Sequence, residues 1–321
     1  MKAVITMAGE GSRLLPVTKG LRKEMLPLFY RGKGGVPVLA PVAHLVVNSL
    51  HAAGVSNVTM VVGNDAASIL RYFTEDGNLL DRHAHHQDRL VETLALYDLL
   101  SQMHFSWVIQ SSPAGFGDAL LRSSAAVGEH PFLLHAADAL LMERTTGRAL
   151  SAMSHLLFQK KASAVLFVRK VRDPRRYGVV EGVPDGRWDG YRSLQVTGME
   201  EKPTQPRSSW AATAMYAFSP EIFDILRELR QKDPQTELEV TNGIEGLIER
   251  GRKVYALISR PSEERWLSVG SPEGYFRGLH YSYRAAMRAP PAKGKATAVR
   301  APPSGSSGTP PRRRRSSSAP S

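Results

Sequence analysis

The sequence has 321 residues, of which 42% are hydrophobic and 22% charged, and this composition excludes a fibre and a wholly disordered chain. The absence of cysteine excludes a disulfide framework, a cysteine zinc site and a thiol nucleophile, and it fits a reducing compartment. The net charge of +12 suggests nucleic-acid binding, but residues 288 to 321 hold eight Lys or Arg and no acidic residue, which leaves only +4 for residues 1 to 287.

The apolar stretch near the amino terminus extends over only about six residues before a glycine, which is too short for a secretory signal. No other run approaches the roughly 20 apolar residues of a membrane span. We therefore expect a cytoplasmic protein that has no contact with a membrane.

The first 140 residues alternate between predicted strands and helices. Strands are expected over residues 2–7, 58–62, 106–110 and 131–136, and helices over residues 36–53, 90–102 and 119–127. Such alternation predicts parallel strands joined by right-handed crossovers. The expected fold class is therefore α/β, with a mostly parallel central sheet, helices on both faces, and ligands bound at the carboxyl ends of the strands.

The pattern changes after residue 162. Strands are expected over residues 163–169, 177–180 and 211–218, and helices over residues 220–230, with Ser219 as N-cap, and 241–249. From about residue 289 onward the chain consists mainly of Pro, Ser, Gly, Ala and Arg, a composition that predicts disorder. We assign residues 288–321 to a disordered basic tail whose contacts with nucleic acid are expected to be non-specific.

A glycine-rich basic loop follows the first predicted strand and carries the strongest functional signal. Residues 8 to 16 have the sequence AGEGSRLLP, and residues 23 to 27 have the sequence KEMLP. Gly9 and Gly11 let the backbone approach a phosphate and present N–H donors to it, while Arg13 and Lys23 supply positive charge for a triphosphate. The loop lacks the Gly-Lys-Ser/Thr ending of a Walker loop, and Leu14 stands where the dinucleotide fingerprint requires its third glycine.

Three polar residues further along the chain have side chains suited to the rest of a nucleotide sugar. Gln110 ends a predicted strand, and its amide can pair with both a donor and an acceptor on the edge of uracil or thymine. Glu201 can accept hydrogen bonds from sugar hydroxyls, and the ammonium of Lys202 can bind a sugar phosphate. Each of these residues alone is also consistent with an ordinary surface position, so the order of the motifs decides between the two interpretations.

Residues 8 to 27 resemble the signature of the sugar nucleotidyltransferase family, G-x-G-(T/S)-R-(L/F)-x-P-x-T followed by K-E-M-L-P. Residues 18 to 27 are especially similar to bacterial-type UTP–glucose-1-phosphate uridylyltransferases. Five further blocks occur in the family's order, at residues 110–119, 132–141, 177–180, 200–203 and 239–242. The resemblance spans residues 1 to about 285.

The resemblance implies a Rossmann-like nucleotidyltransferase domain over residues 1–287. Its nucleotide-binding half is expected over residues 1–140 and its sugar-phosphate-binding half over residues 141–287. The implied reaction is attack of a sugar-phosphate oxygen on the α-phosphorus of a nucleoside triphosphate, with release of pyrophosphate. UTP and glucose 1-phosphate are the expected substrates, Mg²⁺ is the expected cofactor, and a homo-oligomer is the expected assembly.

The resemblance also implies a role for each residue that matches a family motif. The expected catalytic residues are Arg13, Lys23 and Lys202, and Asp138 is the expected ligand of Mg²⁺. The nucleotide is expected to contact Ala8, Gly9, Gly11, Gln110 and Gly115, and the sugar phosphate is expected to contact Gly178, Glu201 and Lys202.

The sequence departs from the family pattern near the expected metal ligand. Ser268 stands where the family usually has a second metal-binding aspartate, and Asn242 stands where the family usually has Asp after Thr241. Ala136 and Ala137 precede Asp138, where a glycine is usual. A serine hydroxyl is a weaker ligand than a carboxylate for a hard cation.

Three interpretations of these departures follow. Asp138 and the substrate phosphates hold Mg²⁺ alone, or a nearby carboxylate such as Glu263, Glu264 or Glu273 substitutes for the missing aspartate. Alternatively, the chain binds a nucleotide sugar without catalysis and serves as a regulatory subunit. We favour an active enzyme because Arg13, Lys23, Lys202 and Asp138 are all present.

Other functions compete with uridylyl transfer. Thymidylyl transfer from dTTP is a rival because uracil and thymine present the same edge to Gln110. Nucleic-acid binding is disfavoured because the basic residues cluster in the tail without interleaved aromatic residues. His83, His85 and His86 lie in a polar stretch without cysteine partners, so we interpret them as part of a solvated segment rather than a metal site.

Overall fold

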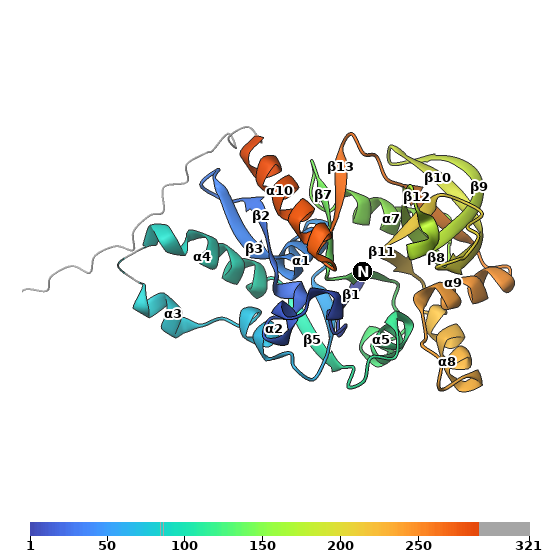
Figure 1. The fold of residues 1–321 in the computed structure, drawn as a ribbon, viewed down its shortest axis with the longest axis horizontal. Helices are drawn as coiled ribbons and strands as arrows, with labels where there is room; N and C mark the ends of the chain where they lie inside the picture. The colour runs from blue at the N-terminus through green and yellow to red at the C-terminus, as the bar shows by residue number, and fades with distance from the viewer. Residues whose placement is uncertain (84, 86, 289–321) are drawn as a thin grey trace, which may run out of the picture. The chain divides into compact units, whose positions relative to one another are not determined.

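A mixed sheet of nine strands forms the framework of the computed structural model, which describes residues 1–83, 85 and 87–288 (Figure 1). The strands lie in the order β5-β4-β1-β6-β11-β8-β12-β10-β9. In chain order, their bounds are β1 Lys2–Met7, β4 Asn57–Val62, β5 His104–Ile109, β6 Phe132–Ala136, β8 Ala164–Lys170, β9 Gly178–Trp188, β10 Tyr191–Glu201, β11 Trp210–Phe218 and β12 Val254–Ile258. The predicted tail from residue 289 onward lies outside the described residues.

Strand direction divides this sheet into two regions. β5, β4, β1 and β6 pair in parallel, as the alternation in the first 140 residues predicted. β11 is antiparallel to β6 and β8, and β10 is antiparallel to β12 and β9, whereas β8 and β12 pair in parallel. The expectation of a mostly parallel sheet is therefore wrong, since the second half of the chain makes the sheet mixed.

The long hairpin formed by β9 and β10 accounts for part of this error. The predicted strand over residues 177–180 is only the beginning of β9, and no strand was predicted over the residues of β10. Asp189 and Gly190 connect the two strands with φ of 46° and 85°, the left-handed conformation that a tight hairpin turn requires. A turn this short can join only antiparallel neighbours.

Helices cover both faces of the sheet, as predicted. Along β1, Ala3, Ile5 and Met7 face one core with α1 and α7, while Val4 faces a second core with α5, α8 and α9, because side chains alternate along a strand. The helices are α1 Val42–Ala52, α2 Ala67–Tyr72, α3 Gly77–Arg82, α4 Gln87–Ser101, α5 Phe116–Arg122, α6 Ser124–Val127, α7 Arg148–Gln159, α8 Ile222–Lys232, α9 Val240–Glu249 and α10 Pro272–Arg288. None of the helices in this described part of the chain is long and apolar enough to cross a membrane.

Several predicted helices begin later or are divided. The helix expected over residues 36–53 starts at Val42, and β3 Pro37–Pro41 occupies its predicted beginning. Proline lacks a backbone N–H and disfavours the helical conformation in the residue before it, so Pro41 marks this boundary. α8 starts at Ile222 after Glu221 rather than after Ser219. The helix expected over residues 119–127 is divided into α5 and α6 at Ser123.

Two small sheets accompany the large one. β2 Pro27–Arg31 pairs with β3 in an antiparallel hairpin that packs against α10. β7 Ala139–Glu143 pairs with β13 Glu264–Ser268, and these strands are antiparallel although more than a hundred residues separate them. Asp138 lies between the carboxyl end of β6 and the start of β7. Because β13 pairs with β7, the second small sheet brings the segment just before α10 to the carboxyl end of β6.

Candidate active site

The loop after β1 is shaped by two glycines. Gly11 has φ of 70° and ψ of 27°, and the Thr18 hydroxyl donates a hydrogen bond to its carbonyl at 3.0 Å. A Cβ atom on Gly11 would lie 2.9 Å from Thr18 Cγ2, and one on Gly9 would lie 3.1 Å from Lys23 Nζ. The glycines that follow Ala8 therefore allow the loop to fold closely over Lys23.

Lys23 and Asp138 meet at the edge of the sheet next to this loop. β1 and β6 are parallel neighbours with Thr6 opposite Ala136, so the residues that follow them lie at the same edge. The Lys23 ammonium lies 2.7 Å from an Asp138 carboxylate oxygen, and the two side chains are only 17% and 22% exposed. The structure thus brings together the predicted cation and the predicted metal ligand.

The electrostatics of this pair favour both charged forms. Burial alone would raise the pKa of Asp138, but the Lys23 ammonium and the Arg13 guanidinium outweigh burial and hold that pKa below its usual value. Burial alone would lower the pKa of Lys23, but Asp138 and Glu24 raise it overall. Lys23 and Asp138 therefore form a charged pair.

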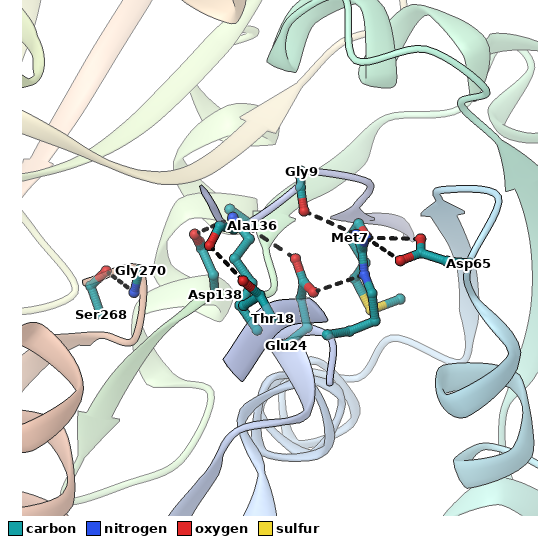
Figure 2. Close-up of polar contacts among 12 residues, drawn as sticks. Met7, Gly9, Thr18, Glu24, Asp65, Ala136, Asp138, Ser268 and Gly270 are labelled. Carbon is teal, nitrogen blue, oxygen red and sulfur yellow. Dashed lines mark hydrogen bonds and ion pairs between the residues drawn. The ribbon is translucent and has the colours of Figure 1, made fainter. Parts of the chain in front are cut away.

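Arg13 and Ser268 join this pair around Gly270. A Cβ atom on Gly270 would lie 3.3 Å from Asp138 Oδ2, 3.4 Å from Arg13 Nη2 and 3.5 Å from Ser268 Oγ. Ser268 lies opposite Ala139 in the pairing of β13 with β7, and Gly270 donates its N–H to the Ser268 hydroxyl at 3.3 Å (Figure 2). Ser268, which stands where the family usually has a second metal-binding aspartate, therefore lies next to Asp138.

Two of the carboxylates expected to substitute at Ser268 have other partners. Glu264 lies at the opposite end of β13, where it is buried and accepts hydrogen bonds from the Tyr191 hydroxyl and the Arg260 N–H. Glu263 forms ion pairs with Arg148 and Arg260. The interpretation that Glu263 or Glu264 substitutes for the aspartate does not fit this geometry, because the direction of β13 carries both away from Asp138. Glu273 lies in the first turn of α10.

The donors around Asp138 fit a magnesium ion that is shared with a substrate. Within residues 1–83, 85 and 87–288, no cluster of three or more His, Cys, Asp or Glu side chains could hold a metal ion. Asp138 supplies one carboxylate and Ser268 one hydroxyl. Mg²⁺ commonly uses one or two carboxylates together with waters and substrate phosphates, so this small donor set is compatible with that ion.

Asn242 has a structural role at the start of α9. Its side-chain oxygen accepts a hydrogen bond from the Glu239 N–H at 3.2 Å, and the Glu239 side chain caps the helix in return. This reciprocal arrangement satisfies two N–H groups at the helix start. Asn242, which stands where the family usually has Asp, therefore takes part in capping α9.

Gln110 and Gly115 lie in a second group at the end of β5. The Gln110 side chain is buried and donates from Nε2 to the Asp118 carboxylate at 2.8 Å and to the Gly115 carbonyl at 3.2 Å. Gly115 has φ of 105°, and a Cβ atom there would lie 2.2 Å from the Leu238 carbonyl oxygen. The Gly117 N–H donates to that same carbonyl at 2.7 Å, so the loop after β5 packs backbone to backbone on the segment before α9.

Gly178, Glu201 and Lys202 form a third group. Glu201 lies opposite Gly178 in the pairing of β10 with β9, and a Cβ atom on Gly178 would lie 3.2 Å from a Glu201 carboxylate oxygen. The Lys202 ammonium lies 3.0 Å from the Glu201 carboxylate, and this contact is the main reason that the pKa of Lys202 is raised. Burial, and after it the Glu201 charge, raises the pKa of nearby Glu239 to about 7.

The three groups remain separate in their polar contacts. Among the residues that the structure describes, no hydrogen bond or ion pair joins Lys202 to Lys23 or to Asp138. Lys23 and Asp138 lie together in the first group, and the register of β9 and β10 brings Lys202 and Glu201 to Gly178 in the third.

Arg22 and Glu24 are buried at the site and were missed by the sequence analysis. Arg22 donates from Nη2 to the carbonyls of Met7 at 2.7 Å and Gly9 at 3.0 Å, and from Nη1 to Asp65 at 2.9 Å (Figure 2). The Glu24 side chain is 1% exposed and lies 3.9 Å from the Lys23 ammonium. Asp65 comes shortly after β4, which is the parallel neighbour of β1. Its place in the sequence was a signal that could have indicated an acidic partner for Arg22.

Burial dominates the ionisation of Glu24. It raises the pKa of Glu24 to about 7 although the neighbouring Lys23 and Arg22 both act to lower it. A buried carboxyl group thus lies 3.9 Å from the Lys23 ammonium and 3.7 Å from the Arg22 guanidinium, with a pKa near neutral pH.

Known proteins resemble this chain in both sequence and fold. Residues 2–282 match the nucleotidyl transferase family. The UTP–glucose-1-phosphate uridylyltransferase of Streptococcus pneumoniae is 29% identical over 280 residues, which cover 86% of this chain and 88% of the relative. The enzyme of the same name from Streptococcus pyogenes is 30% identical over 281 residues, which cover 86% of each chain.

Solved structures extend the similarity to the fold. The structure of apo UDP-glucose pyrophosphorylase aligns with a TM-score of 0.75 and 25% identity, over 88% of this chain and 98% of that one. The UTP-bound UGPase from Acinetobacter baumannii aligns with a TM-score of 0.71 and 25% identity, over 87% and 92% of the two chains. Together with the family match over residues 2–282, these similarities show that the chain belongs to the nucleotidyl transferase family.

Proposed function

We propose that this chain makes UDP-glucose from UTP and glucose 1-phosphate with release of pyrophosphate. The relatives that match most of its length carry the name of that activity. The observation that carries the proposal is the convergence of the Lys23 ammonium and the Asp138 carboxylate, 2.7 Å apart, beside the glycine loop. A cation next to a carboxylate that can bind a metal ion, both beside a phosphate-binding loop, is an arrangement suited to transfer from a triphosphate.

The reaction is an in-line displacement at phosphorus. A phosphate oxygen of glucose 1-phosphate forms a bond to the α-phosphorus of UTP, and the bond from that phosphorus to the α–β bridging oxygen breaks. The electron pair of the broken bond leaves with pyrophosphate. The protein forms no covalent intermediate in this scheme, so the rate depends on positioning and on stabilising the charge of the leaving group.

The glycine loop and its cations are proposed to hold the triphosphate. The backbone of Ala8, Gly9 and Gly11 can approach the phosphates because two of these residues lack a side chain. Lys23 exchanges its contact with Asp138 for a phosphate oxygen, and Arg13 binds the pyrophosphate that leaves. The exchange frees the Asp138 carboxylate, which with the Ser268 hydroxyl would hold Mg²⁺. When bound, Mg²⁺ supplies charge neutralisation to the phosphate oxygens.

The two other groups are proposed to bind the ends of the substrates. Gln110 and Gly115 contact the uracil base, which places nucleotide recognition in residues 1–140. Gly178, Glu201 and Lys202 bind the sugar phosphate, which places sugar recognition in residues 141–287. Lys202 is suited to this role because its ammonium is exposed while Glu201 holds it at 3.0 Å.

Ser268 favours a second candidate function. Because a neutral hydroxyl lies beside Asp138 where the family usually has a carboxylate, the chain could bind a nucleotide sugar without turning it over. The distinction is a kinetic one, since both candidates use the same binding residues.

Pyrophosphate release from purified protein tests the proposal. UTP, dTTP and CTP are each combined with glucose 1-phosphate and with other sugar 1-phosphates, with and without Mg²⁺. We expect release with UTP and glucose 1-phosphate that depends on Mg²⁺. A preference for dTTP would indicate that the chain transfers a thymidylyl group. Binding of UDP-glucose without release of pyrophosphate from any substrate pair would indicate that the chain binds nucleotide sugars without catalysis.

A further inference from the structure

The buried carboxylate of Asp118 receives donors from three elements. Asp118 lies in the first turn of α5 and is 6% exposed. Its Oδ2 accepts from Gln110 Nε2 at the end of β5 and from Arg122 Nε within α5, both at 2.8 Å. Its Oδ1 accepts from Arg230 Nη2 in α8 at 3.4 Å. Two guanidinium groups thus offset the free energy that burying a carboxylate would otherwise cost.

Arg230 connects this carboxylate to two loops. It donates to the Ala114 carbonyl at 3.1 Å from Nη2, and to the carbonyls of Pro234 and Thr236 at 3.1 Å from Nη1. The same loops are joined by the Leu238 N–H, which donates to the Ala114 carbonyl at 2.9 Å. Asp118 is therefore part of a fixed framework rather than a mobile surface group.

This framework decides which way the Gln110 amide points. An ionised carboxylate only accepts hydrogen bonds, so Gln110 must turn its Nε2 group, not its carbonyl oxygen, toward Asp118. The second hydrogen on Nε2 is directed to the Gly115 carbonyl at 3.2 Å. With both N–H groups engaged, Gln110 can offer a ligand only its carbonyl oxygen, an acceptor. The expectation that Gln110 pairs with both a donor and an acceptor therefore does not fit this geometry.

We propose that Asp118 is a positioning residue that determines which bases the site accepts, by holding the Gln110 amide with its carbonyl oxygen toward the base. The inference rests on the proposed function, which puts the base at Gln110. Uracil and thymine each carry one donor on the pairing edge, the N3–H, and this donor matches the fixed acceptor. Cytosine has an unprotonated N3 at the corresponding position, whose lone pair would face the Gln110 oxygen.

Substitution of Asp118 by asparagine tests this role. An asparagine side chain of the same shape can present either an oxygen or an N–H, so Gln110 would be free to turn its amide over. We expect the ratio of kcat/KM for UTP to that for CTP to fall at least tenfold in Asp118→Asn. A residue with a merely structural role would lower both values together and leave the ratio unchanged.

Arg122→Gln is the matched control. It removes an ion pair from the same carboxylate but leaves the hydrogen bond between Asp118 and Gln110, so we expect the wild-type ratio. Circular dichroism and thermal unfolding confirm that each variant is folded. A folded Asp118→Asn protein with the wild-type ratio would overturn the inference.

A modified nucleotide tests the amide orientation without any substitution. 3-Methyluridine 5′-triphosphate lacks the N3–H, so the wild-type protein should use or bind it at least tenfold less well than UTP. Equal use of the two nucleotides would contradict a fixed acceptor at Gln110, even if Asp118→Asn did not fold.

Binding measurements separate this inference from the proposed function. If the wild-type protein turns over no substrate pair, the proposed function fails, but calorimetry still measures the binding preference for UTP over CTP. Loss of that preference in Asp118→Asn would support the inference in either case, and its persistence would overturn it.

Discussion

The Lys23 ammonium lies 2.7 Å from the Asp138 carboxylate, although 115 positions separate the two residues in the sequence. The pair forms because β1 and β6 are parallel neighbours and the loop after β1 returns over the sheet edge. In the proposed reaction, the triphosphate supplies an anion to Lys23 and the metal ion supplies a cation to Asp138. Substrate binding then replaces the ion pair between Lys23 and Asp138 with two others, one between Lys23 and a phosphate and one between Asp138 and the metal ion. Each buried charge thus keeps a partner of opposite sign.

Loss of either partner is expected to lower turnover. In Lys23→Ala and in Asp138→Asn, the rate at saturating UTP and glucose 1-phosphate should fall at least tenfold, which corresponds to about 1.4 kcal/mol of barrier stabilisation. The measurement is pyrophosphate release. Lys232→Ala, which removes an exposed ammonium in the last turn of α8, serves as the control. Unchanged rates in both site variants would contradict the roles assigned to the pair.

A carboxylate at position 268 is expected to tighten metal binding. Ser268 lies beside Asp138, and Ser268→Asp would add a charged oxygen ligand where a neutral hydroxyl stands. The Mg²⁺ concentration that gives half-maximal activity should fall several-fold, as measured by titrating Mg²⁺ at fixed substrate. Ser268→Asn adds similar bulk without charge and should not produce this gain. If Ser268→Asp required the same Mg²⁺ concentration as the wild-type protein, position 268 would not be part of the metal site.

Glu24 is expected to make stability depend on pH near neutrality. Burial, the largest effect, raises its pKa to about 7 in the folded chain, from 4.5 for an ordinary glutamate. A carboxyl whose pKa is raised by folding destabilises the fold as pH rises above 4.5, and this penalty stops growing above about pH 7. Glu24→Gln removes the penalty. It should therefore stabilise the protein by on the order of 2 kcal/mol more at pH 8 than at pH 5.

Urea unfolding at the two pH values measures the difference for Glu24→Gln. An equal change in the free energy of unfolding at pH 5 and pH 8 would mean that Glu24 does not titrate in this range. Substitution of Glu75, an exposed glutamate, by glutamine provides the comparison.

A side chain at position 115 is expected to destabilise the fold. A Cβ atom there would lie 2.2 Å from the Leu238 carbonyl oxygen, and φ of 105° is strained for any other residue. Gly115→Ala should lower the free energy of unfolding by about 2 kcal/mol or more. At Gly128, φ is 63° and ψ is −145°, which is also a conformation that side chains disfavour, but nothing lies within 4 Å of an added Cβ. Gly128→Ala therefore carries the backbone strain without the clash and should cost less than Gly115→Ala. Equal losses in chemical denaturation would contradict the packing of Gly115 on Leu238.

The parallel part of the fold was predictable because its signals are local. β1, β4 and β6 are short apolar runs that end within two residues of a glycine or an aspartate, and their observed bounds differ from the predicted ones by at most one residue. Their common direction places the loop after β1 beside Asp138, so the central pair of the site followed from the same pattern.

The rest depended on contacts between distant segments. β13 pairs with β7 across more than a hundred residues, so the sequence could not show that Glu264 points away from the site while Ser268 lies beside it. The turn at Asp189 and Gly190 was a local signal for the β9–β10 hairpin that the sequence analysis did not use. Arg22 acquires its role only when the carbonyls of Met7 and Gly9 are folded over it.

Direct detection of the product is the most decisive measurement. Purified protein is incubated with UTP, glucose 1-phosphate and Mg²⁺, and UDP-glucose is identified chromatographically, with Lys23→Ala analysed in parallel. The proposal predicts UDP-glucose and pyrophosphate in equal amounts, at least tenfold more slowly in the variant. Absence of UDP-glucose from a folded wild-type protein that binds UTP would contradict it.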